Sequence, residues 1–217
     1  MSSEAIDVTE MLAVHDAMRR EYASLPLLVK SIADDDVARA DVVADHIELL
    51  DRVMELHHAG EDELLWPLVR ERMPEAEAMP EVEEEHRELN GALKEVVVLA
   101  ETWRRTPSAT NRAALHTRLI AFEKALLMHL AHEERESLPL IANSLTVEEF
   151  GAFGTYVRAG LAPQQRSIVL GMILDAMGPE RGDSLLGNID AHDREEFERS
   201  GRAEYRADTG LLLDGWG

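Results

Sequence analysis

The chain has 217 residues and no cysteine, and its 43 Asp and Glu residues against 22 Lys and Arg residues give a formal net charge of −21. Without cysteine it forms no disulfides, thiolate metal sites or iron–sulfur clusters, and it has no cysteine nucleophile. A chain this acidic repels the phosphates of DNA and RNA, which excludes a nucleic-acid partner, and 45% apolar residues exclude global disorder.

Four long runs of apolar residues recur with helical spacing in the first 145 positions, where Ala, Leu, Glu, Met and Arg dominate. They predict helices over about 8–33, 37–73, 81–105 and 109–144. Pro67 and Pro139 fall inside the second and fourth runs and should kink or end those helices. Long amphipathic helices with short connections predict an all-α fold, an antiparallel up-down four-helix bundle.

The residues expected to face the core of this bundle are Met11, Met18, Tyr22, Leu25, Leu50, Val53, Leu64, Leu68, Val82, Leu89, Leu93, Val96, Leu119, Phe122, Leu126 and Leu140.

The sequence changes in character after Ser144. Thr146 is placed to cap a short helix with Glu148 and Glu149 in its first turn, and Pro163 opens a second helix. Gly and Asp interrupt the rest. We expect two parts: a bundle over residues 1–145, and a short helical C-terminal appendage over 146–217, packed on the bundle and without recognisable chemistry of its own.

No run approaches the ~18 consecutive apolar residues that a membrane span needs. The N-terminal segment is acidic and lacks the basic start and apolar stretch of a signal peptide. These features predict a cytoplasmic protein without a membrane partner.

One motif occurs twice. Residues 57–68 align with 129–140 at an offset of 72, and both contain His-x-x-x-Glu followed six residues later by Pro. Positions four apart lie on one face of a helix, so His57 and Glu61 share the inward face, as do His129 and Glu133. Carboxylates on an apolar face are costly unless a cation neutralises them.

The other two long helices each contribute one inward histidine, His15 and His86. Each alone is more typical of a hydrogen-bonded core residue, and each Glu alone of a solvated face. Matched inward histidines from four helices, two with Glu one turn later, favour a metal site. Four neutral nitrogens and two carboxylates able to bridge suit two iron ions, with two histidines on each.

This pattern resembles the hemerythrin-like HHE cation-binding family over about residues 8–145. The resemblance lies in His15, His57-x-x-x-Glu61, His86 and His129-x-x-x-Glu133, with the strings HHAGEDELLWP and EEEHREL. It implies a four-helix bundle with a non-haem di-iron centre, bridged by carboxylates and an oxo or hydroxo group. By the same resemblance His15 and His57 bind one iron, His86 and His129 bind the other, and Glu61 and Glu133 bridge them.

One position departs from the oxygen-carrying hemerythrins. They have a fifth histidine one turn before the third-helix ligand, where this chain has Val82. The departure resembles the four-histidine members linked to nitric oxide and iron–sulfur repair, and it argues against simple reversible O₂ carriage. Four histidines also leave more open coordination on the metals.

The remaining histidines and carboxylates near the motifs receive secondary interpretations. The pairs His58–Asp62 and His132–Glu136 are interpreted as supporting or surface groups, although direct metal binding by His58, His132 or Asp62 stays open. Asp62 and Glu134 are placed to orient a metal-binding imidazole through its free N–H. His46 lies too far along its helix for the site, which indicates core packing or a channel lining. The acidic run Glu81 and Glu83–Glu85 is predicted to be solvated.

Three function classes remain. The first is a protein that binds or senses O₂ or NO and relays its state through residues 146–217. The second is an enzyme, catalase-like or NO-reactive, and the third is a structural bundle without metal chemistry. We favour a di-iron protein that binds, senses or reacts with O₂, NO or peroxide in oxidative or nitrosative stress, a role implied by the resemblance.

Two other metal sites are weaker alternatives. Ferritin-like di-iron carboxylate oxidases use Glu-x-x-His pairs, present here as Glu55-x-x-His58 and Glu83-x-x-His86, but these lie on consecutive helices. Zinc is disfavoured because six convergent ligands exceed a tetrahedral set.

Overall fold

The computed structural model describes residues 5–75 and 79–213, and every regular element within these ranges is helical. The part of the chain after Ser144 is helical as well, as its sequence predicts. Across the described ranges, no helix combines the length and the apolar character needed to cross a membrane.

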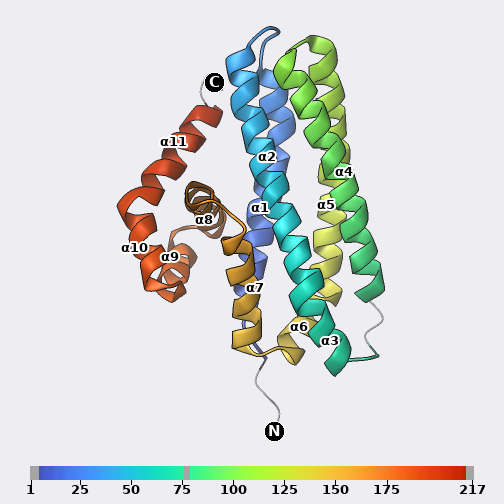
Figure 1. Ribbon diagram of the computed structural model, residues 1–217, viewed down its shortest axis with the longest axis vertical. Helices are drawn as coiled ribbons and strands as arrows, with labels where there is room; N and C mark the ends of the chain where they lie inside the picture. Colours follow the sequence, from blue (N-terminus) through green and yellow to red (C-terminus); the bar gives the residue numbers. More distant parts are fainter. Residues whose placement is uncertain (1–4, 76–78, 214–217) are drawn as a thin grey trace.

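Four long helices lie side by side, and successive ones run in opposite directions (Figure 1). Helix α1 contacts α2 and α5, and α4 also contacts α2 and α5, so the four helices surround a common interior. Their bounds are α1 Thr9–Ser31, α2 Val37–Gly60, α4 Met79–Arg105 and α5 Ala109–Glu136. Side chains cap two of them, because Asp36 accepts from the Arg39 N–H and Ser108 from the Asn111 N–H.

The two prolines interrupt their helices in different ways. Before Pro67 the chain continues without a break through a π-helical segment, η1 Glu61–Leu65, into α3 Trp66–Arg72. The Trp66 N–H donates to the carbonyl of Glu61, five residues earlier, and this wider turn accommodates a ring that clashes with an α-helical turn. Before Pro139 the helix ends at Glu136, and α6 Leu138–Ser144 restarts after Ser137.

Five further helices and a second π-helical segment lie along one side of α1 and α2, in orange to red in Figure 1. They are α7 Val147–Ala159, α8 Pro163–Met177, α9 Pro179–Asn188, α10 Ala191–Glu196, η2 Phe197–Gly201 and α11 Arg202–Leu213. Thr146 and Glu149 form a complete capping box at the start of α7, which confirms the predicted cap.

Close approach fixes α7 and α8 to their neighbours. A Cβ atom on Gly60 would lie only 2.9 Å from ring atoms of Phe153 on α7, which is too close for an ordinary contact. The absence of a side chain at Gly60 therefore permits α7 to approach the end of α2. Arg52 of α2 donates to the Gly160 carbonyl just after α7, and α8 contacts α1. The C-terminal helices therefore cover the part of α2 that carries the predicted metal ligands.

The core forms as predicted. Of the residues expected to face inward, those of the first and third helices are fully buried, and Leu64, Leu68 and Leu140 are half-buried near the proline interruptions. The largest cluster fills the space between the four long helices, and a second, containing Trp66, Val82 and Phe153, closes the end near α3 and α6.

Candidate metal centre

All six predicted ligands meet in the interior of the four long helices. His15 comes from α1, His57 from α2, Glu61 from the start of η1, His86 from α4, and His129 and Glu133 from α5. Each is buried, with at most 2% of its surface exposed. His58 of α2 joins them and is 1% exposed.

The seven side chains form two neighbouring clusters. The candidate ligand atoms of His15, His57, Glu61 and Glu133 lie within 4.8 Å of one another, and so do those of His58, His86 and His129. Each cluster is compact enough for one cation to contact all its members.

The two carboxylates lie between the clusters. Glu61 places Oε1 3.3 Å from His57 Nε2 and Oε2 3.4 Å from His86 Nε2. Glu133 places Oε2 3.6 Å from His15 Nε2 and 3.5 Å from His129 Nε2. Each carboxylate thus approaches one imidazole of each cluster, the arrangement expected of a carboxylate that bridges two metal ions.

The atoms that face the centre have no hydrogen-bond partner among the described residues. They are Nε2 of His15, His57, His58, His86 and His129, and both carboxylate oxygens of Glu61 and Glu133. Buried polar atoms are nearly always satisfied, and an orphaned one costs about 1–3 kcal/mol. Nine such atoms converging on one place fit a site built to hold metal.

The family comparison agrees with this geometry. The model of the family described as Hemerythrin HHE cation binding domain matches residues 7–141. The chain belongs to this family. Searches of curated proteins and of solved structures each find no significant match. As the HHE family name implies cation binding, the buried His and Glu clusters are the parts of this chain that fit it.

Supporting hydrogen bonds hold four of the five imidazoles of this hemerythrin-like centre at Nδ1, on the side away from the cluster. Glu134 lies 3.0 Å from His15, Asp62 2.9 Å from His86, Glu85 2.9 Å from His129 and Asn90 2.9 Å from His58. A carboxylate or amide at Nδ1 fixes the ring and leaves Nε2 free for a metal. The interpretation of Asp62 and Glu134 as groups that orient an imidazole agrees with these contacts.

His58 differs from its interpretation as a supporting or surface group. Its ring stacks on that of His86 with centroids 4.1 Å apart, it belongs to the second cluster, and its Nε2 is buried without a hydrogen-bond partner among the described residues. Val82, where oxygen carriers have their fifth histidine, packs in the apolar cluster near α3. The structure thus brings a fifth imidazole to the centre from α2, which weakens the argument for more open coordination.

Glu85 also differs from the sequence expectation. It belongs to the acidic run predicted to be solvated, yet it is half-buried and its two oxygens contact His129 and His132 at 2.9 and 2.8 Å. One signal in the sequence could have revealed it, because Glu85 directly precedes His86 on a helix whose neighbour carries His129. His132 is held by Glu85 outside the clusters.

The ferritin-like alternative fails on geometry. Glu55 is exposed and pairs with Arg52 at 2.8 Å, and Glu83 pairs with Arg70 on the surface. Neither carboxylate belongs to the buried clusters. His46 lies outside the clusters too, buried with its Nε2 3.2 Å from Glu21, in agreement with the core packing expected of it.

Burial keeps three of the imidazoles, those of His57, His58 and His129, neutral. Burial and the neighbouring His15 lower the pKa of His57 to about 3, and burial next to His86 lowers the pKa of His58 well below its ordinary value. Burial also lowers the pKa of His129. Neutral imidazole is the form that binds metal, so these three rings are ready to bind near neutral pH without releasing a proton.

The two carboxyl groups influence each other in opposite directions. Burial and the nearby Glu133 raise the pKa of Glu61 well above its ordinary value. Burial opposes the ionisation of Glu133 as well, but His15, Glu61 and His57 outweigh it and lower its pKa to about 2. Two adjacent buried carboxylates are costly to ionise together, and a cation between them removes that cost.

Proposed function

We propose that this chain is a hemerythrin-like protein that holds two iron ions and binds, senses or reacts with O₂, NO or peroxide. One observation carries the proposal: two histidine clusters share two carboxylates, and all nine of their inward atoms lack a partner among the described residues. Nitrogen donors with few carboxylates suit iron better than magnesium or calcium.

In this proposal each iron has its own histidines. His15 and His57 would hold one ion, His58, His86 and His129 would hold the other, and Glu61 and Glu133 would supply oxygens to both. The four long helices, α1, α2, α4 and α5, would form the antiparallel up-down bundle expected of the family. Bound iron would supply redox chemistry toward a small ligand, while the surrounding apolar residues keep bulk water away. Such reactivity would serve the cell in oxidative or nitrosative stress.

The residues around the site contribute orientation. Glu134, Asp62, Glu85 and Asn90 fix four rings, and the salt bridge between Arg19 and Glu134, at 2.7 Å, extends this support to the surface. These contacts hold the Nε2 atoms in place before metal binds, which lowers the cost of ordering the site.

The test is iron analysis combined with an optical spectrum. After anaerobic reconstitution with Fe²⁺, we expect about two iron ions per chain, and a charge-transfer spectrum that changes on adding peroxide, O₂ or NO. His57→Ala and Glu61→Ala should lose iron and the spectrum. His116→Ala is the matched control, because His116 lies on α5 outside both clusters. Less than one iron per wild-type chain would overturn the proposal.

A measurement of turnover distinguishes an enzyme from a binding or sensing protein. Sustained peroxide loss with oxygen evolution that disappears in Glu61→Ala favours an enzyme. A reversible spectral change without turnover favours a binding or sensing protein.

A further inference from the structure

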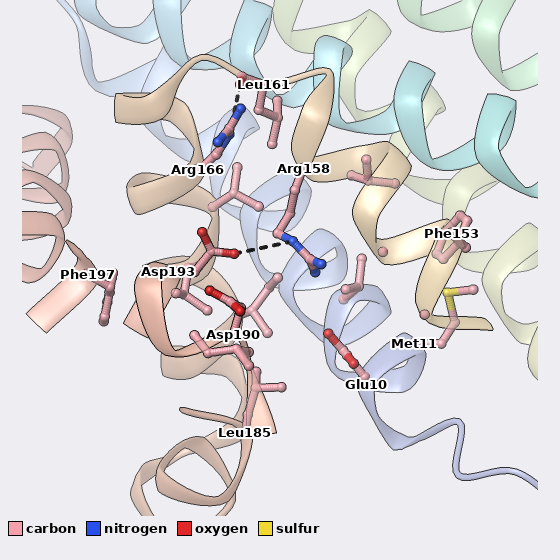
Figure 2. A pocket seen from close by; sticks show the side chains of 18 of the residues that line it. Glu10, Met11, Phe153, Arg158, Leu161, Arg166, Leu185, Asp190, Asp193 and Phe197 are labelled. Carbon is pink, nitrogen blue, oxygen red and sulfur yellow. Dashed lines mark hydrogen bonds and ion pairs between the residues drawn. The ribbon is translucent and has the colours of Figure 1, made fainter. Parts of the chain in front are cut away.

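A cavity of about 620 Å³ lies between α1 and α2 on one side and the C-terminal helices on the other. Figure 2 shows it bounded by α1 and by the segments that carry Phe153, Arg166 and Leu185. Sites for small organic molecules typically occupy about 300–1,000 Å³ and are mainly apolar. This cavity fits both criteria, and Val14, Val157, Leu170, Ile173 and Leu185 supply much of its wall.

The charged residues of the cavity are largely engaged by the protein itself. Arg158 reaches toward Asp193, 3.7 Å away (Figure 2). Arg166 donates through Nε to the carbonyl of Leu161 at 3.0 Å, and Asp190 accepts from the backbone N–H at the start of α10.

The balance of charge also disfavours an anionic ligand. The lining contains three arginines and five carboxylates, on a chain that is strongly acidic overall. An anion brought into this cavity would meet a net negative wall, whereas a neutral molecule would meet no such repulsion.

One wall of the cavity reaches the metal centre through His57, beside Met11 and Phe153. Four of the five imidazoles of the centre have a hydrogen-bond partner at Nδ1. The fifth, His57, has none among the described residues, and because the residue is only 2% exposed, bulk water gives it little compensation. When Nε2 binds a metal, as proposed above, the ring proton lies on Nδ1 and needs an acceptor. A molecule in the cavity can supply that acceptor.

We propose that this cavity is a binding site for one neutral, mainly apolar organic molecule that presents a hydrogen-bond acceptor to His57. The apolar wall provides most of the affinity, and the engaged arginines and the surplus of carboxylates exclude anions. The site thereby places an organic ligand against a residue of the metal centre. The preference for an acceptor rests on the proposed metal binding by His57, whereas the location of the site and its selection against anions are measurable without metal.

Fluorescent probes test the chemistry of the ligand. Prodan (6-propionyl-2-dimethylaminonaphthalene) is neutral, apolar and has a carbonyl acceptor. On the full-length chain reconstituted with Fe²⁺, we expect saturable, blue-shifted binding of one prodan per chain. Its carbonyl-free analogue 2-dimethylaminonaphthalene and the anion 1-anilinonaphthalene-8-sulfonate should each bind at least about tenfold more weakly. Absence of saturable prodan binding, or equal or tighter binding of either comparison probe, would overturn the proposal.

Replacing a glycine of α7 by a large residue would place a side chain in the cavity and test its location. A Cβ on Gly154 meets only the end of the flexible Arg158 side chain, at 3.2 Å, and a Cβ on Gly151 meets nothing within 4 Å. Both glycines line the cavity. Gly154→Phe and Gly151→Phe should weaken prodan binding at least about tenfold.

Gly91→Phe, on α4 and equally free of neighbours, is the matched control and should bind prodan as the wild type does. Circular dichroism confirms folding, and if Gly154→Phe does not fold, Gly151→Phe decides. Undiminished binding in a folded cavity variant contradicts the location. Iron analysis on the same samples is a separate measurement, so a failure of metal binding is distinguishable from a failure of this site.

Discussion

His57 and His58 are adjacent on α2, so their side chains leave the helix about 100° apart. Adjacent residues usually serve different faces, but α2 packs between α1 and α4, and both directions lead inward. His57 turns toward His15 with ring centroids 5.3 Å apart, and His58 stacks on His86 of α4. One helix thus supplies an imidazole to each cluster.

This geometry yields the first residue-level prediction. His58→Ala removes one of three nitrogens from the second cluster while leaving the first intact, so iron content should fall from about two ions toward about one per chain. His132→Ala, which removes an imidazole held by Glu85 outside the clusters, should retain more iron. Iron analysis after reconstitution measures both, and unchanged iron in His58→Ala would contradict a ligand role for His58.

The sequence predicted the members of the site that repeat a pattern. His57, Glu61, His129 and Glu133 follow from the repeated motif, and His15 and His86 from their place on an apolar face. The sequence did not identify His58 as a member of the site, because periodicity assigns each helix one inward face, whereas a helix packed between two neighbours has two. The contact of Glu85 was not predicted for a related reason, since an acidic run does not indicate which of its members contacts an imidazole on another helix.

A second residue-level prediction concerns the ion pair that joins α3 to α7. Arg72 donates to both oxygens of Glu149, at 2.7 and 2.6 Å, and this contact, with the backbone of Thr146, lowers the pKa of Glu149 to about 2. A depressed pKa stabilises the fold above the ordinary value near 4.5, and this stabilisation disappears as the pH falls toward about 2.

Glu149→Gln should therefore be less stable than the wild type at pH 7, with the difference shrinking between pH 4.5 and 2. Urea unfolding at a series of pH values measures it. Glu148→Gln, an exposed neighbour in the same turn, serves as the control. A difference that does not vary with pH would show that the ionised carboxylate is not responsible.

At the scale of elements, helical periodicity placed the long helices within a few residues of their observed bounds, because each has one dominant apolar face. The π-helical segment before Pro67 was not predictable in this way. The two copies of the motif share their proline, yet one helix widens into η1 and the other breaks at Ser137. The surroundings of the two prolines differ, since α7 packs against η1 and α6 packs on α3.

The attachment of α11 to α8 gives an element-level prediction. A Cβ on Gly171 would lie 2.6 Å from both Cδ atoms of Tyr205, and the Tyr205 hydroxyl is held by a hydrogen bond of 2.7 Å to Asp175. Gly171→Ala must push α11 away from α8, which should cost about 1–3 kcal/mol of unfolding free energy.

Gly210→Ala on α11 is the matched control, because its Cβ meets nothing within 4 Å. Better helix propensity should make it neutral or more stable by up to about 1 kcal/mol. Urea unfolding of both variants gives the comparison. Equal stability of the two would mean that α11 is not closely packed at Tyr205.

At the scale of the whole molecule, the acidic composition divides into two populations. Most carboxylates are on the surface, where they pair with arginines or meet water, as in the group of Asp41, Asp45, Glu48 and Glu101 around Arg104. Glu61 and Glu133 are fully buried. Nothing in the net charge distinguishes the two populations, and the helical register alone separates them.

If the clusters hold metal as proposed, the buried pair should make the stability of the whole chain depend on metal. Without a cation, nine inward atoms lack hydrogen-bond partners among the described residues, at about 1–3 kcal/mol each if none is hydrated. A ligand that binds the folded state alone stabilises it by about 2.7 kcal/mol when its free concentration is 100 times its Kd. Fe²⁺ under anaerobic conditions should therefore raise the Tm of the metal-free protein, and chelation should reverse the change.

Glu61→Leu tests whether the buried carboxyl is the origin of this dependence. Replacing a buried ionisable group by an apolar one of similar size is often stabilising, so the metal-free variant should melt at a higher temperature than metal-free wild type. The same change removes a carboxylate that contacts both clusters, so Fe²⁺ should raise its Tm much less. Calorimetry with and without Fe²⁺ measures both effects, with His116→Ala as the control that keeps the wild-type response. A metal-free Glu61→Leu protein less stable than wild type would mean that Glu61 supports the fold itself rather than the metal.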